Sequence, residues 1–238
     1  MPTPDVKALV CDVFGTVVNW RDSVIREGTA LGAKHGLTLD WGAFVDEWRT
    51  QGYSGAIRTV LRGEAPWRRV DELHLTKLES MLAERNITLP REDVVHFSRV
   101  WHRLDPWPDS VPGLNRIKSR YIISPLSNGD FSLLINMAKF GGLPWDCILT
   151  SELAESYKPD PRVYALAPRY LDLKPEQILM TAAHVNDLRS AKAEGLRTAM
   201  ILRPHEWGPV VGSKEPPPDP DFDYVAAGFE DLASQLGT

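Results

Sequence analysis

The sequence has few cysteines, no long apolar runs and no excess of positive charge. Its 238 residues contain only two cysteines, Cys11 and Cys147, which could form one bridge but not a disulfide framework. Both lie in short apolar runs typical of strands, so we expect two buried thiols and a reducing, cytoplasmic location. No apolar stretch approaches the length of a membrane span, and the N-terminal residues lack the basic start of a signal peptide.

The formal net charge of −5 gives no electrostatic reason to expect nucleic acid or an anionic membrane as a partner. The composition, 43% hydrophobic and 25% charged, is that of an ordinary globular protein. The length fits one core domain with room for a second, smaller one.

Short apolar runs alternate with amphipathic segments over most of the chain. This alternation predicts an α/β fold with a doubly wound, Rossmann-like parallel sheet. The expected strands are residues 7–12, 121–124, 147–150, 178–182 and 198–202, with a last one near 224–225. The clearest helices of this core are expected at residues 131–140, 162–171, 187–194 and 228–236.

The stretch from about Trp20 to Arg103 differs from the rest because it contains helical patterns and no convincing strand. We interpret it as a helical cap inserted after the first strand, with helices at 24–35, 44–61, 70–84 and 94–104. The predicted domains are therefore a core of residues 1–18 and 105–238 and a cap of residues 19–104. The proline-rich residues 215–222 are expected to form a surface loop.

Polar motifs follow several of the expected strands, where parallel sheets place their active sites. Asp12 ends the first strand and enters a tight turn at Gly15, which suits a carboxylate nucleophile. The other motifs are Ser127-Asn128-Gly129 after the second strand, the loop Lys158-Pro159-Asp160 with Tyr164 further on, and the run from Ala182 to Asp187 that contains His184.

In order and spacing these four motifs resemble those of the haloacid dehalogenase superfamily, and within it the type II 2-haloacid dehalogenases. The resemblance covers nearly the whole chain, including the cap. It implies hydrolysis of a small 2-halo acid to a 2-hydroxy acid and halide, with water as the second substrate and no cofactor or metal. Related enzymes are often homodimers, so a homodimer is also expected.

Two losses, of an acid and of a metal ligand, separate this chain from the phosphatases of the same superfamily. Those phosphatases carry a second aspartate two residues after the nucleophile, which protonates the leaving group. Phe14 occupies this position and carries no proton. The phosphatases also bind Mg²⁺ through acidic residues of the fourth motif, where this chain has Ala182 and Ala183. A phosphatase, and a catalytically idle binding protein of the same fold, remain the alternatives.

The resemblance implies a catalytic role for five residues. Asp12 would attack the carbon that bears the halogen and form an ester, which water would then cleave at the carbonyl carbon of Asp12. Lys158 would balance the negative charge of Asp12 and the substrate. Asp187 would anchor Lys158 and help position water. Thr16 and Ser127 resemble residues that hydrogen-bond the nucleophile or the substrate carboxylate.

Five further residues are assigned to substrate or halide binding. Arg49 matches a cap arginine that takes up the departing halide, although a lone arginine on a helix is more often a surface residue. Asn128 is a candidate second halide donor, and Tyr164 and Phe14 are expected close to the site. His184 stands where the better-known type II enzymes have asparagine. It could be a base for the hydrolytic water or a hydrogen-bonded replacement, and it could mark a subgroup that accepts fluorinated acids.

The loss of an acid at Phe14 and of a ligand at Ala183 predicts activity without a metal ion. Turnover of chloroacetate is therefore expected to be unchanged in excess EDTA, as measured by halide release. Loss of turnover on chelation, with recovery on addition of Mg²⁺, would contradict this assignment and favour the phosphatase.

Overall fold

In the computed structural model, which describes residues 5–209 and 218–238, the strands form one parallel sheet in the order β3-β2-β1-β4-β5-β6. The strands are β1 (Ala8–Cys11), β2 (Ile122–Ser127), β3 (Leu149–Thr150), β4 (Ile178–Ala182), β5 (Arg197–Ile201) and β6 (Tyr224–Ala226). The parallel α/β sheet predicted from the sequence is confirmed.

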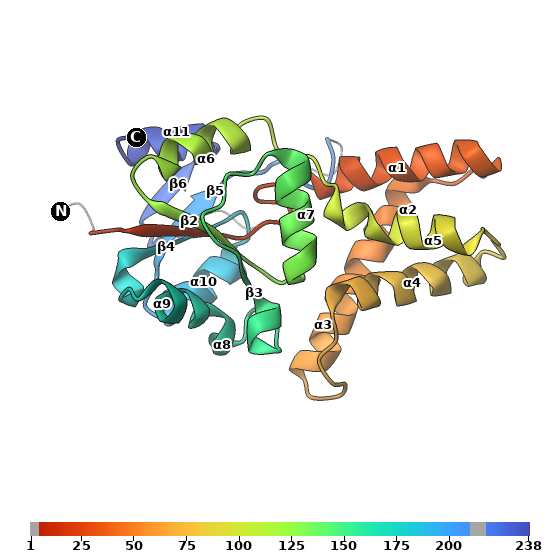
Figure 1. Cartoon of the computed structure of the whole chain (residues 1–238), viewed down its shortest axis with the longest axis horizontal. Helices are drawn as coiled ribbons and strands as arrows, with labels where there is room; N and C mark the ends of the chain where they lie inside the picture. Colours follow the sequence, from red (N-terminus) through yellow and green to blue (C-terminus); the bar gives the residue numbers. More distant parts are fainter. Residues whose placement is uncertain (1–4, 210–217) are drawn as a thin grey trace.

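Both faces of the sheet are buried, because the side chains of the central strand β1 alternate between two apolar clusters. Leu9 and Cys11 pack with residues of α6 (Ser110–Lys118), α7 (Phe131–Gly141) and α11 (Phe229–Gln235). Val10 packs with residues of α8 (Pro161–Tyr164), α9 (Leu166–Leu171) and α10 (Val185–Ala193) on the other face. Figure 1 shows α6 and α11 on one side of the strands and α8, α9 and α10 on the other.

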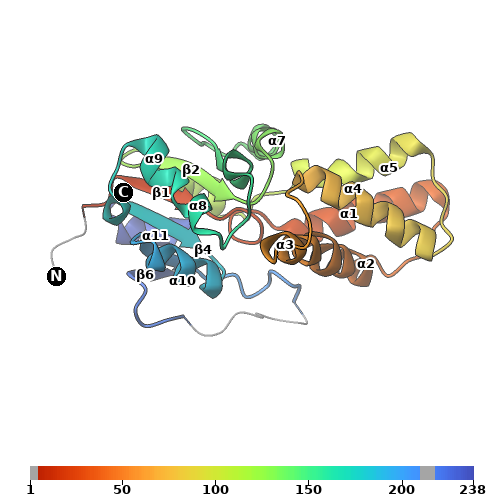
Figure 2. The ribbon, with the colours of Figure 1, turned by 90° about the horizontal axis from the view of Figure 1, so that it is seen from below.

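The expected helical insertion is confirmed and lies beyond one end of the sheet (Figures 1 and 2). Its helices are α1 (Trp20–His35), α2 (Trp41–Glu47), α3 (Ser54–Leu61), α4 (Val70–Glu84) and α5 (Arg91–Ser98). The boundaries predicted from the sequence, 1–18 with 105–238 for the core and 19–104 for the cap, stay a proposal. Within the described ranges, no helix has the length and apolar character needed to cross a membrane.

The helix predicted over residues 44–61 is present, but it is not an α-helix throughout. A π-helix, η1 (Trp48–Tyr53), separates α2 from α3 and buries Trp48, Arg49, Gly52 and Tyr53. Gly52 lies against α4, where an added Cβ would approach Lys77 Cγ to 2.6 Å. The wider turn therefore directs both Arg49 and Tyr53 inward, and π-turns are frequent at functional sites.

Three further elements differ from expectation in their extent. The helix expected at 94–104 ends at Ser98 and continues as a 3₁₀ turn, η2 (Arg99–His102). The helix expected at 162–171 is divided into α8 and α9 at Ala165. Because β3 begins only at Leu149, Cys147 is partly exposed rather than buried, and both cysteines are free. Of the loop predicted at 215–222, residues 215–217 lie outside the described residues.

A carboxylate of the core holds the first turn of a cap helix. Asp130, at the start of α7, accepts hydrogen bonds from the backbone N–H groups of Val70 and Asp71, both at 2.8 Å. These are among the N–H groups that a helix N-terminus leaves without partners. Tyr157 of the core also donates from its hydroxyl to the carbonyl of Arg68. These bonds fix the start of α4, which packs against η1, relative to the core.

Candidate active site

The carboxyl ends of the central strands meet the cap at a pocket of about 480 Å³, which has room for a small organic acid. Polar side chains from all four sequence motifs, together with Phe14, line it alongside residues of η1 and α3. The lining residues are Asp12, Phe14, Arg49, Tyr53, Ser54, Ile57, Arg58, Leu61, Asn128, Lys158, Pro159, Tyr164, His184, Asn186, Asp187, Ser190, Glu206 and Trp207.

Asp12 follows the last residue of β1 and is buried, with hydrogen-bond donors at one carboxylate oxygen. Thr16 Oγ1 donates to Asp12 Oδ2 at 2.8 Å, and His184 Nδ1 lies 3.1 Å from the same oxygen. Lys158 Nζ lies 3.6 Å from Asp12 Oδ1. Burial by itself would raise the pKa of Asp12, but Lys158, His184 and Thr16 hold that pKa well below its usual range. The carboxylate is therefore ionised at neutral pH, as a nucleophile must be.

Lys158 is oriented by a second carboxylate and by the loop that carries it. Its Nζ donates to Asp187 Oδ2 at 2.8 Å, and Tyr164 donates from its hydroxyl to Asp187 Oδ1 at 2.7 Å. The Lys158 backbone N–H donates to Asn128 Oδ1 at 2.7 Å. Each oxygen of Asp187 therefore accepts a hydrogen bond. These contacts fix the position of the Lys158 ammonium group in the site.

His184 lies between Asp12 and a carboxylate that the sequence analysis missed. His184 Nε2 is 3.2 Å from Glu206 Oε1 and 3.1 Å from Glu206 Oε2. Trp20 Nε1 also donates to Glu206 Oε1, at 3.0 Å. Glu206 follows β5 in a segment without a recognisable motif, so no signal in the sequence could have identified it.

Gly15 makes room for Glu206. Its φ of +88° lies in the left-handed region that favours glycine. A Cβ added to Gly15 would come within 2.1 Å of Glu206 Oε1. The glycine that the sequence indicated only as a turn residue is therefore also needed for the close approach of a buried carboxylate.

Arg49 enters the pocket from η1 with its guanidinium among aromatic rings. The guanidinium carbon lies 4.1 Å from the centre of the Tyr53 ring, 5.4 Å from that of Phe14 and 5.5 Å from that of Trp20. Arg49 Nη1 is buried and has no hydrogen-bond partner among the described residues. A weakly hydrated cation with an unused donor is suited to binding an anion.

Thr16 and Ser127, both predicted from the sequence, are buried next to the pocket and hold neighbouring backbone groups in place. Thr16 is fully buried, and its hydroxyl oxygen accepts a hydrogen bond from the backbone N–H of Ala183 at 2.9 Å. Ser127, the last residue of β2, is also fully buried, and its Oγ accepts from the backbone N–H of Gly129 at 3.2 Å. Neither residue lines the pocket, and Ser127 supports the turn that presents Asn128.

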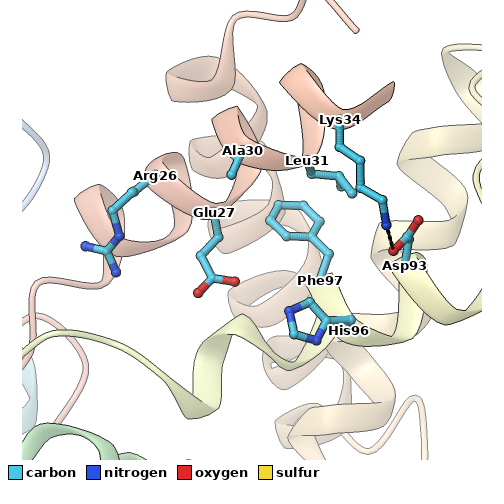
Figure 3. Close-up of a pocket in the computed structure, with 8 residues that line it drawn as sticks. All are labelled: Arg26, Glu27, Ala30, Leu31, Lys34, Asp93, His96 and Phe97. Atoms are coloured by element: carbon cyan, nitrogen blue, oxygen red, sulfur yellow. Dashed lines mark hydrogen bonds and ion pairs between the residues drawn. The ribbon is translucent and has the colours of Figure 1, made fainter. Parts of the chain in front are cut away.

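The described part of the chain contains no group of three or more His, Cys, Asp or Glu side chains arranged to hold a metal ion. A second pocket lies on the cap between α1 and α5 (Figure 3). Its charged side chains pair with one another or with neighbours, as in the 2.7 Å ion pair of Lys34 with Asp93. None of the four sequence motifs reaches it, so the pocket at Asp12 is the candidate active site.

A parallel-sheet core, a helical cap and a carboxylate between them define a capped hydrolase. The family described as haloacid dehalogenase-like hydrolase matches residues 6–195, and the chain belongs to this family. It is 41% identical to a defluorinating L-2-haloacid dehalogenase of known crystal structure, over 100% of this chain and 99% of that one, with a TM-score of 0.94. A second L-2-haloacid dehalogenase structure is also 41% identical, over 98% and 99% of the two chains, with a TM-score of 0.93. (S)-2-haloacid dehalogenase 4A of Burkholderia cepacia is 28% identical over 83% of this chain and 84% of its own.

If Arg49 receives an anion, its replacement should weaken halide binding. Loss of one charge-assisted hydrogen bond, worth roughly 1.5–3 kcal/mol, lowers affinity about ten- to hundredfold. We expect this loss of bromide affinity in Arg49→Ala, measured by quenching of tryptophan fluorescence. Arg62→Ala is the control, because Arg62 forms an exposed ion pair with Glu64. Equal bromide affinity in Arg49→Ala and the native chain would remove Arg49 from the anion site.

Proposed function

We propose that this protein hydrolyses short 2-halo carboxylic acids to 2-hydroxy acids through an ester on Asp12, without a cofactor. One observation carries the proposal: an ionised carboxylate at the end of the central strand and a buried arginine with an unused donor line the same pocket. A nucleophile and an anion acceptor on opposite sides of a small substrate are what displacement of a halide requires.

In the first half-reaction Asp12 attacks the carbon that bears the halogen. A new C–O bond forms as the carbon–halogen bond breaks, and the halide leaves with the electron pair. Lys158, 3.6 Å from Asp12 Oδ1, offsets the repulsion between Asp12 and the substrate carboxylate. Asp187 keeps Lys158 in place.

The residues around the leaving group stabilise it as an anion. Arg49 donates to the departing halide, and Asn128 is the second donor in the same pocket. Phe14 and Tyr164 line the same pocket and limit the space to a small acid, and the proposed role of Arg49 directs the halogen of that acid toward the cap. Phe14 stands where the phosphatases have the acid that protonates the leaving group. Halide leaves without a proton, so a dehalogenase does not need this acid, whereas a phosphatase does.

In the second half-reaction water attacks the carbonyl carbon of the Asp12 ester. Asp187 positions this water and accepts its proton, since it lines the pocket and lies 2.8 Å from Lys158 Nζ. Thr16 holds Asp12 through the hydrogen bond at 2.8 Å. The bond between the Asp12 carbonyl carbon and the ester oxygen then breaks, and this oxygen, which came from Asp12, leaves with the hydroxy acid.

We also propose a cytoplasmic location and a homodimer. Two free thiols support a reducing cytoplasm. The homodimer rests on the resemblance to related enzymes, and analytical ultracentrifugation measures it directly.

The substrate range follows from the similar proteins, which are described as L- or (S)-2-haloacid dehalogenases, one of them as defluorinating. We expect halide release from L-2-chloropropionate and none above background from the D enantiomer, with fluoro-, chloro- and bromoacetate measured alongside. Release of fluoride would place fluorinated acids among the substrates. No halide from any of these acids, together with phosphate release from phosphate esters in Mg²⁺, would favour the phosphatase instead.

A single turnover in H₂¹⁸O, with enzyme in excess over chloroacetate, separates the ester route from direct attack of water on the substrate. In the ester route heavy oxygen enters the Asp12 side chain, and the first hydroxy acid formed carries light oxygen. Mass spectrometry of the peptide that contains Cys11-Asp12-Val13 is expected to show the label. Asp12→Asn is expected to be nearly inactive, because a neutral amide is a poor nucleophile. A labelled first product with an unlabelled Asp12 would contradict the proposed role.

A further inference from the structure

The two oxygens of Asp12 have different surroundings. Oδ2 faces two groups that can donate to it, Thr16 Oγ1 at 2.8 Å and His184 Nδ1 at 3.1 Å. Thr16 already accepts a hydrogen bond from the N–H of Ala183, so its own hydroxyl hydrogen is free to point at Asp12. Oδ1 accepts no hydrogen bond from the described part of the chain and lies 3.6 Å from Lys158 Nζ. Oδ1 therefore has the lone pair that is free to attack.

His184 has a carboxylate at each of its ring nitrogens. Nδ1 faces Asp12, and Nε2 lies 3.1 and 3.2 Å from the two oxygens of Glu206. Ionised carboxylates only accept hydrogen bonds, so each nitrogen must carry a hydrogen for both contacts to be favourable. A neutral imidazole has one such hydrogen, whereas an imidazolium has two. The geometry therefore fits a positively charged His184.

We propose that Glu206 is a positioning residue that keeps His184 as an imidazolium donor to Asp12 Oδ2, so that His184 and Thr16 stabilise this oxygen as the oxyanion formed during hydrolysis of the Asp12 ester. This inference rests on the proposed ester mechanism and extends it. It assigns His184 as an electrophilic catalyst and not as the base that removes a proton from water.

The bonds of the reaction follow from this assignment. Oδ1 forms the bond to the substrate carbon as halide leaves, and Oδ2 remains the carbonyl oxygen of the ester. Water then adds to the carbonyl carbon and gives one proton to Asp187, while the negative charge moves onto Oδ2. The intermediate collapses by breaking the bond to Oδ1, which leaves with the product and takes a proton from Lys158. Lys158 recovers a proton from Asp187, and the new carboxyl group of Asp12 releases its proton to solvent.

Donors that face the site of developing charge are among the largest contributions to acyl-transfer catalysis. Thr16 and His184 already face Oδ2 in the resting enzyme, so no reorganisation is needed when the charge appears. A base would instead need a nitrogen lone pair directed at water. Both nitrogens of His184 are directed at carboxylates, which disfavours that role.

Glu206 matters most after the ester has formed. At that stage Asp12 has lost its charge, and Glu206 is the anion that still contacts His184. Burial by itself would raise the pKa of Glu206, but His184 first, and then Trp20 through its hydrogen bond and Arg49 through its positive charge, lower that pKa below its usual value, so Glu206 stays ionised. Burial alone would lower the pKa of His184, but Glu206 and Asp12 raise that pKa well above its usual value.

The protonation state of His184 can be measured without any turnover. In protein labelled with ¹⁵N-histidine, the two ring nitrogens of His184 are expected to give imidazolium signals at about pH 8, well above the usual histidine pKa of about 6.5. His184→Asn identifies the signal. A neutral His184 at this pH in the native enzyme would overturn the inference, even if the enzyme proves to be a dehalogenase.

The kinetic test uses Glu206→Gln, which removes the charge but keeps the size. Ester hydrolysis is expected to slow roughly ten- to hundredfold, less than the roughly hundred- to thousandfold loss on removing an oxyanion donor outright, because the donor is weakened and not removed. Halide should then appear in a burst before the hydroxy acid, with the Asp12 ester visible by intact-protein mass spectrometry. The donor is lost as pH rises through the His184 pKa, so the rate should fall on the alkaline side. In Glu206→Gln this fall should begin at lower pH.

Two further variants complete the test. His184→Asn keeps an N–H donor that does not titrate, so it should retain ester hydrolysis and lose the alkaline fall in rate. If His184 were the base, the same variant would accumulate ester with almost no hydrolysis, which overturns the inference. His205→Gln is the control for the loop, because His205 is exposed, and its rate and pH profile should be native. Absence of halide release in the native enzyme would instead refute the proposed function. The ¹⁵N signals of His184 are measured without turnover, so the two failures can be distinguished.

Discussion

The burial of one carboxylate, Asp12, between core and cap is the constraint on which the rest of the site depends. An isolated buried charge is strongly unfavourable, so cations must surround it. Lys158 and His184 supply two, and each requires its own anion, Asp187 and Glu206 respectively. Two pairs of oppositely charged side chains, Lys158 with Asp187 and His184 with Glu206, thus stabilise the charge that the proposed nucleophile needs.

Arg49 completes this balance from the cap. Among the charged side chains of the pocket that are not exposed, the three carboxylates Asp12, Asp187 and Glu206 are balanced by the three cations Lys158, His184 and Arg49, and the exposed Arg58 adds a further positive charge at the pocket. The Arg49 guanidinium lies among aromatic rings and has an N–H donor without a partner in the described part of the chain. The site can therefore bind an additional anion. Substrate brings a carboxylate and releases a halide, and both are anions that such a site can accept. The bonds from Asp130 to α4 fix the cap against the core, so that Arg49 is presented at this position.

Much of the fold was predictable, because strand and helix periodicity are local properties of the sequence. The runs that end at Asp12 and Ala182 indicated a parallel sheet, and such a sheet brings the ends of its strands together whatever the details of packing. The helix expected over 44–61 is present, but the π-turn within it was not predictable, because it depends on a contact that is not local. Its π-turn exists because η1 packs against α4 and directs Arg49 and Tyr53 inward, and no local pattern of residues encodes that contact.

From the sequence alone, the motifs and the family that they resemble predicted Asp12 as the nucleophile and Lys158 and Asp187 as its partners, and they placed Phe14 where the phosphatases have an acid. Only the tertiary structure decided what His184 contacts. Glu206 is 22 residues further along the chain and belongs to no motif. It reaches His184 because the segment after β5 folds over the site and Gly15 has no side chain to obstruct it. The charge on a histidine is set by its neighbours in space, which no local sequence pattern specifies.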